Sequence, residues 1–231
     1  MKSFIKSYIK SFTIYAVLCT STIAFGEKYK IDESHSEVGF KVKHLMITNS
    51  KGRFDKFEGS FDFDSKTGQI KNLDVKIDTD SVNTNKADRD KHLKNDDFFG
   101  VRTEKGKLVD ANRWMIFKSS KGEVKEGKPA QMAGQLTIKG TTKDVNLDVT
   151  YTGSGKDPWG NSRVGFEATT KVNRKDFGLN WNKSLDAGGV VLGEEVDVFI
   201  AGEAILEAPK KDDQKMADKK DSDKKESSTK K

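Results

Sequence analysis

The sequence predicts an all-β fold, an antiparallel sandwich or barrel of about eight strands. Apolar and polar residues alternate over many short stretches, as at Val38, Phe40 and Val42, which is the period of a half-buried strand. Turn-forming sequences such as Asp157-Pro158-Trp159-Gly160 separate these stretches. A sandwich fills its interior with its own side chains, whereas an eight-stranded barrel leaves room for one small ligand. The alternation alone is compatible with both architectures.

The expected strands follow one another along the chain at 38–44, 57–63, 73–77, 114–117, 136–138, 145–151, 164–170 and 196–206. Only residues 83–95 have the pattern of a helix, which would be short and would have Asn85 as its N-cap. Gly178 follows the seventh strand closely and indicates a turn with positive φ.

The first 26 residues have the pattern of a secretory signal peptide. Lys2, Lys6 and Lys10 precede a mostly apolar run, and Ala24 and Gly26 are small residues of the kind found at a cleavage site. The run is about 15 residues long, which is short of the roughly 20 apolar residues of a membrane span. We therefore expect 1–26 to be removed on export and the folded domain to occupy 27–208.

The C-terminal residues 209–231 are expected to be disordered. They contain nine lysines, six acidic residues and no aromatic residue, so they cannot bury enough apolar surface to fold. Once both ends are set aside, the middle of the chain keeps 30 of the 42 basic residues and 30 of the 36 acidic residues. The folded domain is therefore neutral, and the basic character of the whole chain does not indicate nucleic-acid binding. Its core also forms without a disulfide, because the one cysteine is Cys19.

Residues 88–99 combine a dense run of charged side chains with Leu93 and the pair Phe98-Phe99. A solvated charged segment has no need of two adjacent phenylalanines. A core segment, in turn, could not bury Arg89 and His92 without partners. We therefore expect this segment to lie at the edge of an apolar interior, with its charged side toward water or toward a polar ligand group.

Five short motifs follow one another between residues 28 and 207: Tyr29-x-Ile31-Asp32-x-x-His35-Ser36-x-Val38-x-Phe40-x-Val42-x-His44, Gly52-x-Phe54-x-x-Phe57-x-Gly59, Arg89-Asp90-x-His92-Leu93 with Asp97-Phe98-Phe99, Gly134-x-Leu136-Thr137-Ile138-x-Gly140-x-Thr142-x-x-Val145, and Asn173-Arg174-x-Asp176-Phe177-Gly178. In this order they resemble the YceI-like family of lipocalin-like, polyisoprenoid-binding proteins of the bacterial periplasm. The resemblance implies an extended antiparallel eight-stranded lipocalin-like barrel with a short helix near its mouth. It also implies a long-chain isoprenoid or similar fatty amphiphile as ligand, a periplasmic location and, as is common in the family, a homodimer. Residues 100–113 depart from the family as a longer polar insert without proline.

The expected head-group contacts of such a ligand are Arg89, His92 and Arg174. Arg89 and His92 are three residues apart and share one face of the expected helix, where they could hold a phosphate or carboxylate. The alternative is an internal network that fastens the helix over the barrel, with Arg89 bound to Asp90 or Asp97. Arg174 has a similar alternative, a salt-bridged rim in which it and Asp176 pair with each other or with the Arg89 segment.

The expected contacts of the apolar tail lie on alternating strand positions and on the Phe-Phe pair: Phe40, Val42, Phe54, Phe61, Phe98, Phe99, Phe166 and Val198. Each buried methylene contributes about 0.8 kcal/mol, so a long chain is held without many polar contacts. We therefore expect a protein that carries, stores or sequesters a lipid without breaking a bond.

Two other functions remain open from the sequence. One is a lipid-modifying hydrolase or isomerase that uses His92 with Asp88 or Asp90 as acid and base. The other is a stress or adhesion factor whose barrel is structural and whose tail carries the interactions. The chain contains none of the sequence motifs of serine hydrolases, zinc peptidases or nucleotide-binding enzymes, and its three histidines do not have the spacing of helical metal ligands. We expect no catalytic residue, no cofactor and no bound metal.

Overall fold

The computed structural model describes residues 26–186 and 188–208. The predicted signal peptide, apart from Gly26, and the predicted tail lie outside the described residues and stay predictions. The strands are β1 (Glu27–His44), β2 (Thr48–Phe54), β3 (Phe57–Asp64), β4 (Gln69–Asp78), β5 (Val82–Asn83), β6 (Trp114–Glu123), β7 (Pro129–Ile138), β8 (Thr141–Lys156), β9 (Ser162–Asn173) and β10 (Leu192–Leu206). The helix α1 spans Ala87–Lys94, and short 3₁₀ turns lie at Thr79–Ser81, Asp110–Asn112 and Arg174–Phe177.

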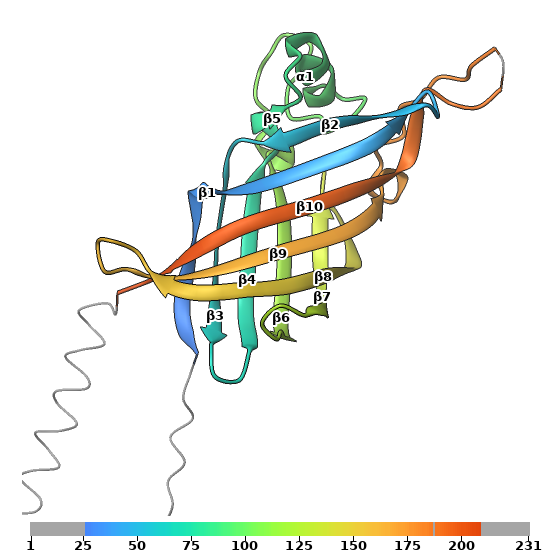
Figure 1. Cartoon of the computed structure of the whole chain (residues 1–231). Helices are drawn as coiled ribbons and strands as arrows, with labels where there is room; N and C mark the ends of the chain where they lie inside the picture. The colour runs from blue at the N-terminus through green and yellow to red at the C-terminus, as the bar shows by residue number, and fades with distance from the viewer. Residues whose placement is uncertain (1–25, 187, 209–231) are drawn as a thin grey trace, which may run out of the picture.

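Eight antiparallel strands close into a barrel (Figure 1). Their order around the barrel is β1-β3-β4-β6-β7-β8-β9-β10, and pairing of β10 with β1 completes the ring. The fold predicted from the alternation and from the family resemblance is therefore confirmed. Residues 26–186 and 188–208 contain no helix that is long and apolar enough to cross a bilayer.

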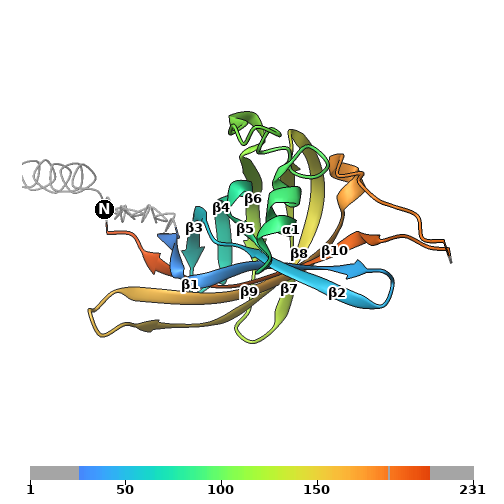
Figure 2. The same cartoon turned by 90° about the horizontal axis from the view of Figure 1, so that it is seen from above.

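The strand β1 serves two neighbours on one of its edges. Its first part pairs with β3, where Tyr29 lies opposite Phe61, and its second part pairs with β2, where Val38 lies opposite Phe54. The register against β10 shifts between Asp32 and Glu37, which is the signature of a bulge that bends a strand. This bend lets β1 leave the barrel wall and extend, with β2, beyond one end of it (Figures 1 and 2). The sequence did not predict β2 or the short β5 that pairs with it.

Apolar side chains from the strands fill the interior in two clusters. The first is rich in aromatic rings: Tyr29, Tyr151 and Phe166 pack edge to face or tilted against Phe63, which is 1% exposed, and Phe61 packs against Tyr29 and Phe166. The second lies toward α1 and includes Val38, Phe54, Phe99, Val101 and Phe177. Such pairs of rings stabilise beyond their buried area.

The helix begins later than the sequence predicted, and Asn85 is not its N-cap. Asn85 has φ +58, and its N–H donates to Asn83 Oδ1 at 2.9 Å, which makes a turn instead of a cap. Lys86 is the N-cap and offers no side-chain bond. Asp90 instead ties the helix to the chain that precedes it, because its Oδ1 accepts from both the N–H and the hydroxyl of Thr84, at 2.8 and 2.5 Å.

Candidate functional site

The barrel encloses two apolar cavities. The lower cavity has a volume of about 170 Å³, and its walls include Phe61 and Phe166 of the aromatic cluster. The upper cavity has a volume of about 140 Å³ and lies beneath α1. Val38, Ile77, Leu136 and Val198 line both, so the two cavities share walls and follow one another along the barrel. An apolar interior of this shape suits an extended hydrocarbon chain.

All eight residues predicted as contacts of an apolar tail lie on the cavity walls. Phe61 and Phe166 line the lower cavity, and Val198 lines both. The other five line the upper cavity: Phe40, Val42, Phe54, Phe98 and Phe99. The alternation along the strands identified the inward face correctly, and contact with a ligand stays a prediction.

Arg174 is the charged side chain that lines the upper cavity. It is 5% exposed, and two of its three guanidinium nitrogens are bound: Nε donates to the carbonyl of Gly193 at 2.8 Å and Nη1 donates to the carbonyl of Leu179. Its Nη2 is buried and has no hydrogen-bond partner. Burial lowers the pKa of this guanidinium, and the nearby Glu194 opposes that shift without pairing with it. A buried N–H donor without an acceptor is costly, so Nη2 is poised to bind an oxygen that enters the cavity.

The local sequence around Arg174 explains how this side chain comes to point inward. Asn173 ends β9 and accepts the N–H of Lys175 at 3.0 Å, which starts a 3₁₀ turn. Gly178 closes that turn with φ +77, as its position in the sequence predicted. The predicted pairing of Arg174 with Asp176 is wrong, because the described partners of Arg174 are backbone carbonyls, that of Leu179 just after this turn and that of Gly193 in β10.

Arg89 and His92 lie in local networks on the outside of the upper cavity. Arg89 donates from Nε to the Thr84 hydroxyl and from Nη2 to the Thr84 carbonyl, both at 2.8 Å. His92 Nε2 lies 2.8 Å from Asp97 Oδ2, and its ring meets Phe98 and Trp181 edge to face. Neither residue lines the described cavities. Their role as head-group contacts stays a prediction.

Trp181 is a member of this assembly that the sequence did not indicate. Its ring lies 4.9 Å from that of His92 and 5.4 Å from that of Phe98, centroid to centroid. It belongs to no alternating strand and to none of the five motifs, so its place beside α1 depends on the path of the chain after Gly178.

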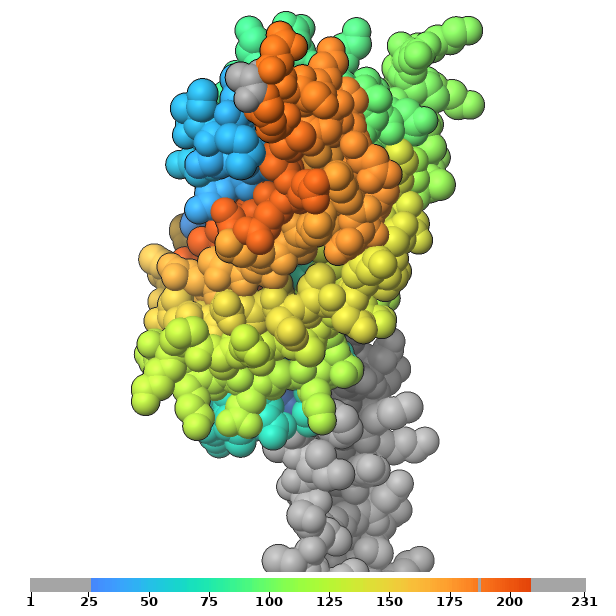
Figure 3. All heavy atoms as spheres, turned by 90° about the vertical axis from the view of Figure 1, so that its right-hand side faces the viewer, coloured from blue at the N-terminus to red at the C-terminus, as the bar shows by residue number. Residues whose placement is uncertain are grey.

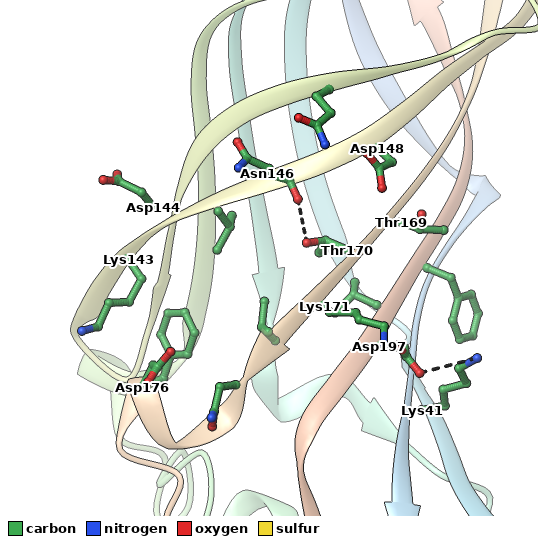
Figure 4. Close-up of a pocket in the computed structure, with 17 residues that line it drawn as sticks. Lys41, Lys143, Asp144, Asn146, Asp148, Thr169, Thr170, Lys171, Asp176 and Asp197 are labelled. Atoms are coloured by element: carbon green, nitrogen blue, oxygen red, sulfur yellow. Dashed lines mark hydrogen bonds and ion pairs between the residues drawn. The ribbon is translucent and has the colours of Figure 1, made fainter.

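The barrel wall is parted next to Arg174. The strands β8 and β9 pair from Lys156↔Ser162 to Asp148↔Thr169, and beyond that point each pairs only with its other neighbour. One hydrogen bond spans the parted segment, from the Thr170 hydroxyl to the Asn146 carbonyl at 2.7 Å (Figure 4). A surface groove of about 630 Å³ lies over this gap. Its rim carries charges of both signs, and five of its lining residues also line the inner cavities: Val145, Thr170, Val172, Phe177 and Val198.

A second, half-buried arginine lies at the start of β9, and its Nε and Nη1 bond carboxylates. Arg163 Nη1 lies 2.6 Å from Asp32 and 3.0 Å from Glu203, and its Nε lies 3.0 Å from Asp157. His35 bonds the same Asp32 at 2.8 Å. The group of Asp32, His35 and Glu203 has the spacing of metal ligands, but the guanidinium of Arg163 already neutralises its carboxylates. This arrangement is an ion-pair network that joins β1, β9 and β10.

Comparison with known proteins agrees with this architecture. Residues 29–204 match the YceI-like domain. The chain is 37% identical to Protein YceI of Salmonella newport over 202 residues, which cover 87% of this chain and 98% of that protein, and to the same extent to Protein YceI of Salmonella arizonae.

Solved structures give the same result. The crystal structure of the Campylobacter jejuni YCEI protein is 31% identical, with a TM-score of 0.59 over 87% of this chain and all of that one. A polyisoprenoid-binding domain from Saccharophagus degradans shares the fold at 15% identity, with a TM-score of 0.53 over 78% of this chain and 98% of that one. The chain therefore belongs to the YceI-like family.

Proposed function

We propose that the protein binds a long-chain isoprenoid or a similar amphiphile inside the barrel and carries, stores or sequesters it in the periplasm. The observation that carries this proposal is the buried, unpartnered Nη2 of Arg174 on the wall of an otherwise apolar cavity. A phosphate, carboxylate or hydroxyl oxygen at the polar end of the ligand fits that donor, because a charge-assisted hydrogen bond would replace the missing one. The apolar tail then extends past Val198 toward the aromatic cluster.

The name of the Saccharophagus degradans domain supports the same class of ligand. The apolar walls support the tail: each methylene moved from water into the cavities contributes about 0.8 kcal/mol. The predicted signal peptide supports the periplasmic location. Proteins named in the comparisons support binding as the function of the fold and do not indicate a catalysed reaction.

The enzymatic alternative has less support from the geometry. His92 is bound to Asp97 and enclosed by two aromatic rings, and Asp90 is bound to Thr84. A general acid or base must reach the atom it protonates or deprotonates. The residues of α1 proposed for this role, His92 with Asp88 or Asp90, do not line the described cavities.

The test is native mass spectrometry of the protein purified from its own host, followed by solvent extraction of what it holds. We expect an intact lipid with one long apolar chain and an oxygen-bearing head. A protein that is empty after purification, and that takes up no farnesyl or longer prenyl phosphate or alcohol in titration, contradicts the proposal.

Variants locate the polar end of the ligand. We expect Arg174→Met to lower prenyl phosphate affinity by about tenfold or more, because a charge-assisted bond to a buried group contributes about 1.5–3 kcal/mol. Arg89→Met is the matched control, since Arg89 is exposed and lines neither cavity. Loss of affinity in Arg89→Met but not in Arg174→Met would place the head group at α1. Turnover of the lipid that is lost in His92→Ala would instead establish an enzyme.

A further inference from the structure

The tip of the β1–β2 hairpin exposes two large apolar side chains. Met46 is 58% exposed and Ile47 is 80% exposed, and among the described residues the other large apolar side chain exposed to this degree is Trp159. The hairpin extends beyond the barrel at the end near α1, whereas the turn that carries Trp159 lies at the opposite side of the molecule (Figure 2). Single exposed apolar residues are ordinary, but two adjacent ones at the end of an extended hairpin are not.

The backbone of this tip is strained. Leu45 and Met46 have φ +51 and +59, and Ile47 N–H donates to the His44 carbonyl at 3.1 Å. Two successive residues with positive φ form a turn that favours asparagine and glycine, because other side chains clash with the backbone there. The geometry of the turn therefore does not explain why Leu45 and Met46 occupy these two positions. Backbone strain of this kind occurs at segments that contact ligands.

A second segment braces the tip. Leu45 N–H donates to the Val191 carbonyl at 2.8 Å, and Ser184 forms a bridge with Val190 within the chain that precedes β10. In the space-filling view the hairpin and this chain lie side by side (Figure 3). Met46 and Ile47 thus project from a hairpin tip that is hydrogen-bonded to the segment before β10.

The hairpin that carries the tip is itself positively charged. Residues 41–51 contain three lysines and no acidic residue. Lys41 pairs with Asp197, but Lys43 and Lys51 are exposed and form no ion pair with any of the described residues. Lysines that flank exposed apolar side chains are typical of segments that lie on anionic membranes, where each contributes to attraction and the apolar groups enter the acyl region.

A second copy of the chain fits this surface less well. A stable protein interface buries about 800 Å² on each partner, far more than two side chains provide. Like charges on both copies would also repel. Shallow insertion into a bilayer needs only a few apolar side chains and is favoured by the lysines.

We propose that residues 43–51 dock the protein on an anionic phospholipid bilayer, with Met46 and Ile47 between the acyl chains and Lys43 and Lys51 against the head groups. Val42 and Leu192, which lie directly beside the tip, line the upper cavity, so docking brings that cavity to the membrane surface. This inference goes beyond the proposed function and does not depend on it.

The test is co-flotation of the full chain with phosphatidylethanolamine–phosphatidylglycerol vesicles that contain no isoprenoid, against phosphatidylcholine vesicles. We expect Met46→Ser/Ile47→Ser to lower the bound fraction by about tenfold. The matched control is Trp159→Ser, which removes an equally exposed apolar side chain at the far side and should bind as the parent does. The lysine-rich tail is present in every variant, so the difference between variants reports the tip.

Two further measurements keep the result interpretable. Lys43→Gln/Lys51→Gln should weaken binding to anionic vesicles severalfold and reduce its salt dependence, whereas Lys125→Gln/Lys128→Gln in the β6–β7 turn should not. Ile47→Trp should shift its fluorescence to shorter wavelength when vesicles are added. The inference is overturned if Met46→Ser/Ile47→Ser floats with vesicles as much as the parent does. It is also overturned if the double variant changes the oligomeric mass measured by sedimentation and leaves vesicle binding unchanged. Co-purification of a lipid tests the proposed function separately.

Discussion

The two arginines at the two ends of β9, Arg163 and Arg174, are held in opposite ways. Arg163 lies in the half of β9 that pairs with β8 and bonds three carboxylates, which raises its pKa. Arg174 follows the half where β8 and β9 part, bonds two carbonyls and keeps Nη2 without a partner, while burial lowers its pKa. A guanidinium bound to a cluster of carboxylates contributes to the fold, whereas one with a buried, unpartnered nitrogen on the wall of an apolar cavity is the one that we propose to bind a ligand. Residue type alone does not distinguish the two.

Among the variants that compare the two ends of β9, we expect Arg163→Met to lower the melting temperature most. It leaves Asp32 and Asp157 nearly buried, at 11% and 6% side-chain exposure, without their cation. Removing one partner of a buried ion pair is strongly destabilising, and we expect a fall in melting temperature of roughly 10 °C. Lys171→Met is the control, because its partners Glu195 and Asp197 are solvated, and it should change melting little. Equal melting temperatures of Arg163→Met and the parent would show that the ion-pair network does not stabilise the start of β9.

The same ion-pair network predicts that the stability of the folded protein falls at low pH. Burial alone would raise the pKa of Asp157, but hydrogen bonds from Asn161 and Arg163 lower it to about 2. The pKa of Asp32 is likewise lowered, by hydrogen bonds that outweigh its burial. A carboxylate with a lowered folded pKa stabilises above its unfolded pKa of about 4, and that stability is lost as pH falls toward the folded value. Melting followed from pH 6 to pH 2 should therefore fall steeply below about pH 4 in the parent and less steeply in Arg163→Met.

The sequence predicted the strands and not the difference between the arginines. Alternation at Val38, Phe40 and Val42 assigned the inward face, since a period of two follows from strand geometry alone. It did not predict β2, because Asn49, Ser50 and Lys51 have no apolar face to bury. The partners of Arg174 are carbonyls set by a turn and by a strand nineteen residues away, as the bond to Gly193 shows. No local pattern encodes such contacts.

A smaller effect on folding is expected at the Arg174 end. Arg174→Met removes a buried charge that lacks a counter-ion, but leaves the carbonyls of Gly193 and Leu179 without donors. The two changes oppose each other, and we expect the free energy of unfolding without ligand to fall by about 1–2 kcal/mol. Urea denaturation of lipid-free protein measures this. A loss as large as that of Arg163→Met would mean that Arg174 serves the fold as Arg163 does.

The smallest effect tests the parted segment between β8 and β9. Thr170→Val keeps the side-chain shape and removes the bond to the Asn146 carbonyl that spans the gap over the groove of Figure 4. We expect a loss of about 0.5–1 kcal/mol in the free energy of unfolding, with faster amide exchange confined to 142–147 and 170–173. The matched variant is Thr169→Val, at the last residue of β9 that pairs with β8, where the backbone ladder carries the pairing and exchange should stay unchanged. If the two variants show the same amide exchange rates, the barrel wall resists local opening equally along the whole of β9. If only Thr170→Val loosens the wall, its flexible part lies beside the free donor of Arg174, because Val172 lines both the groove and the upper cavity.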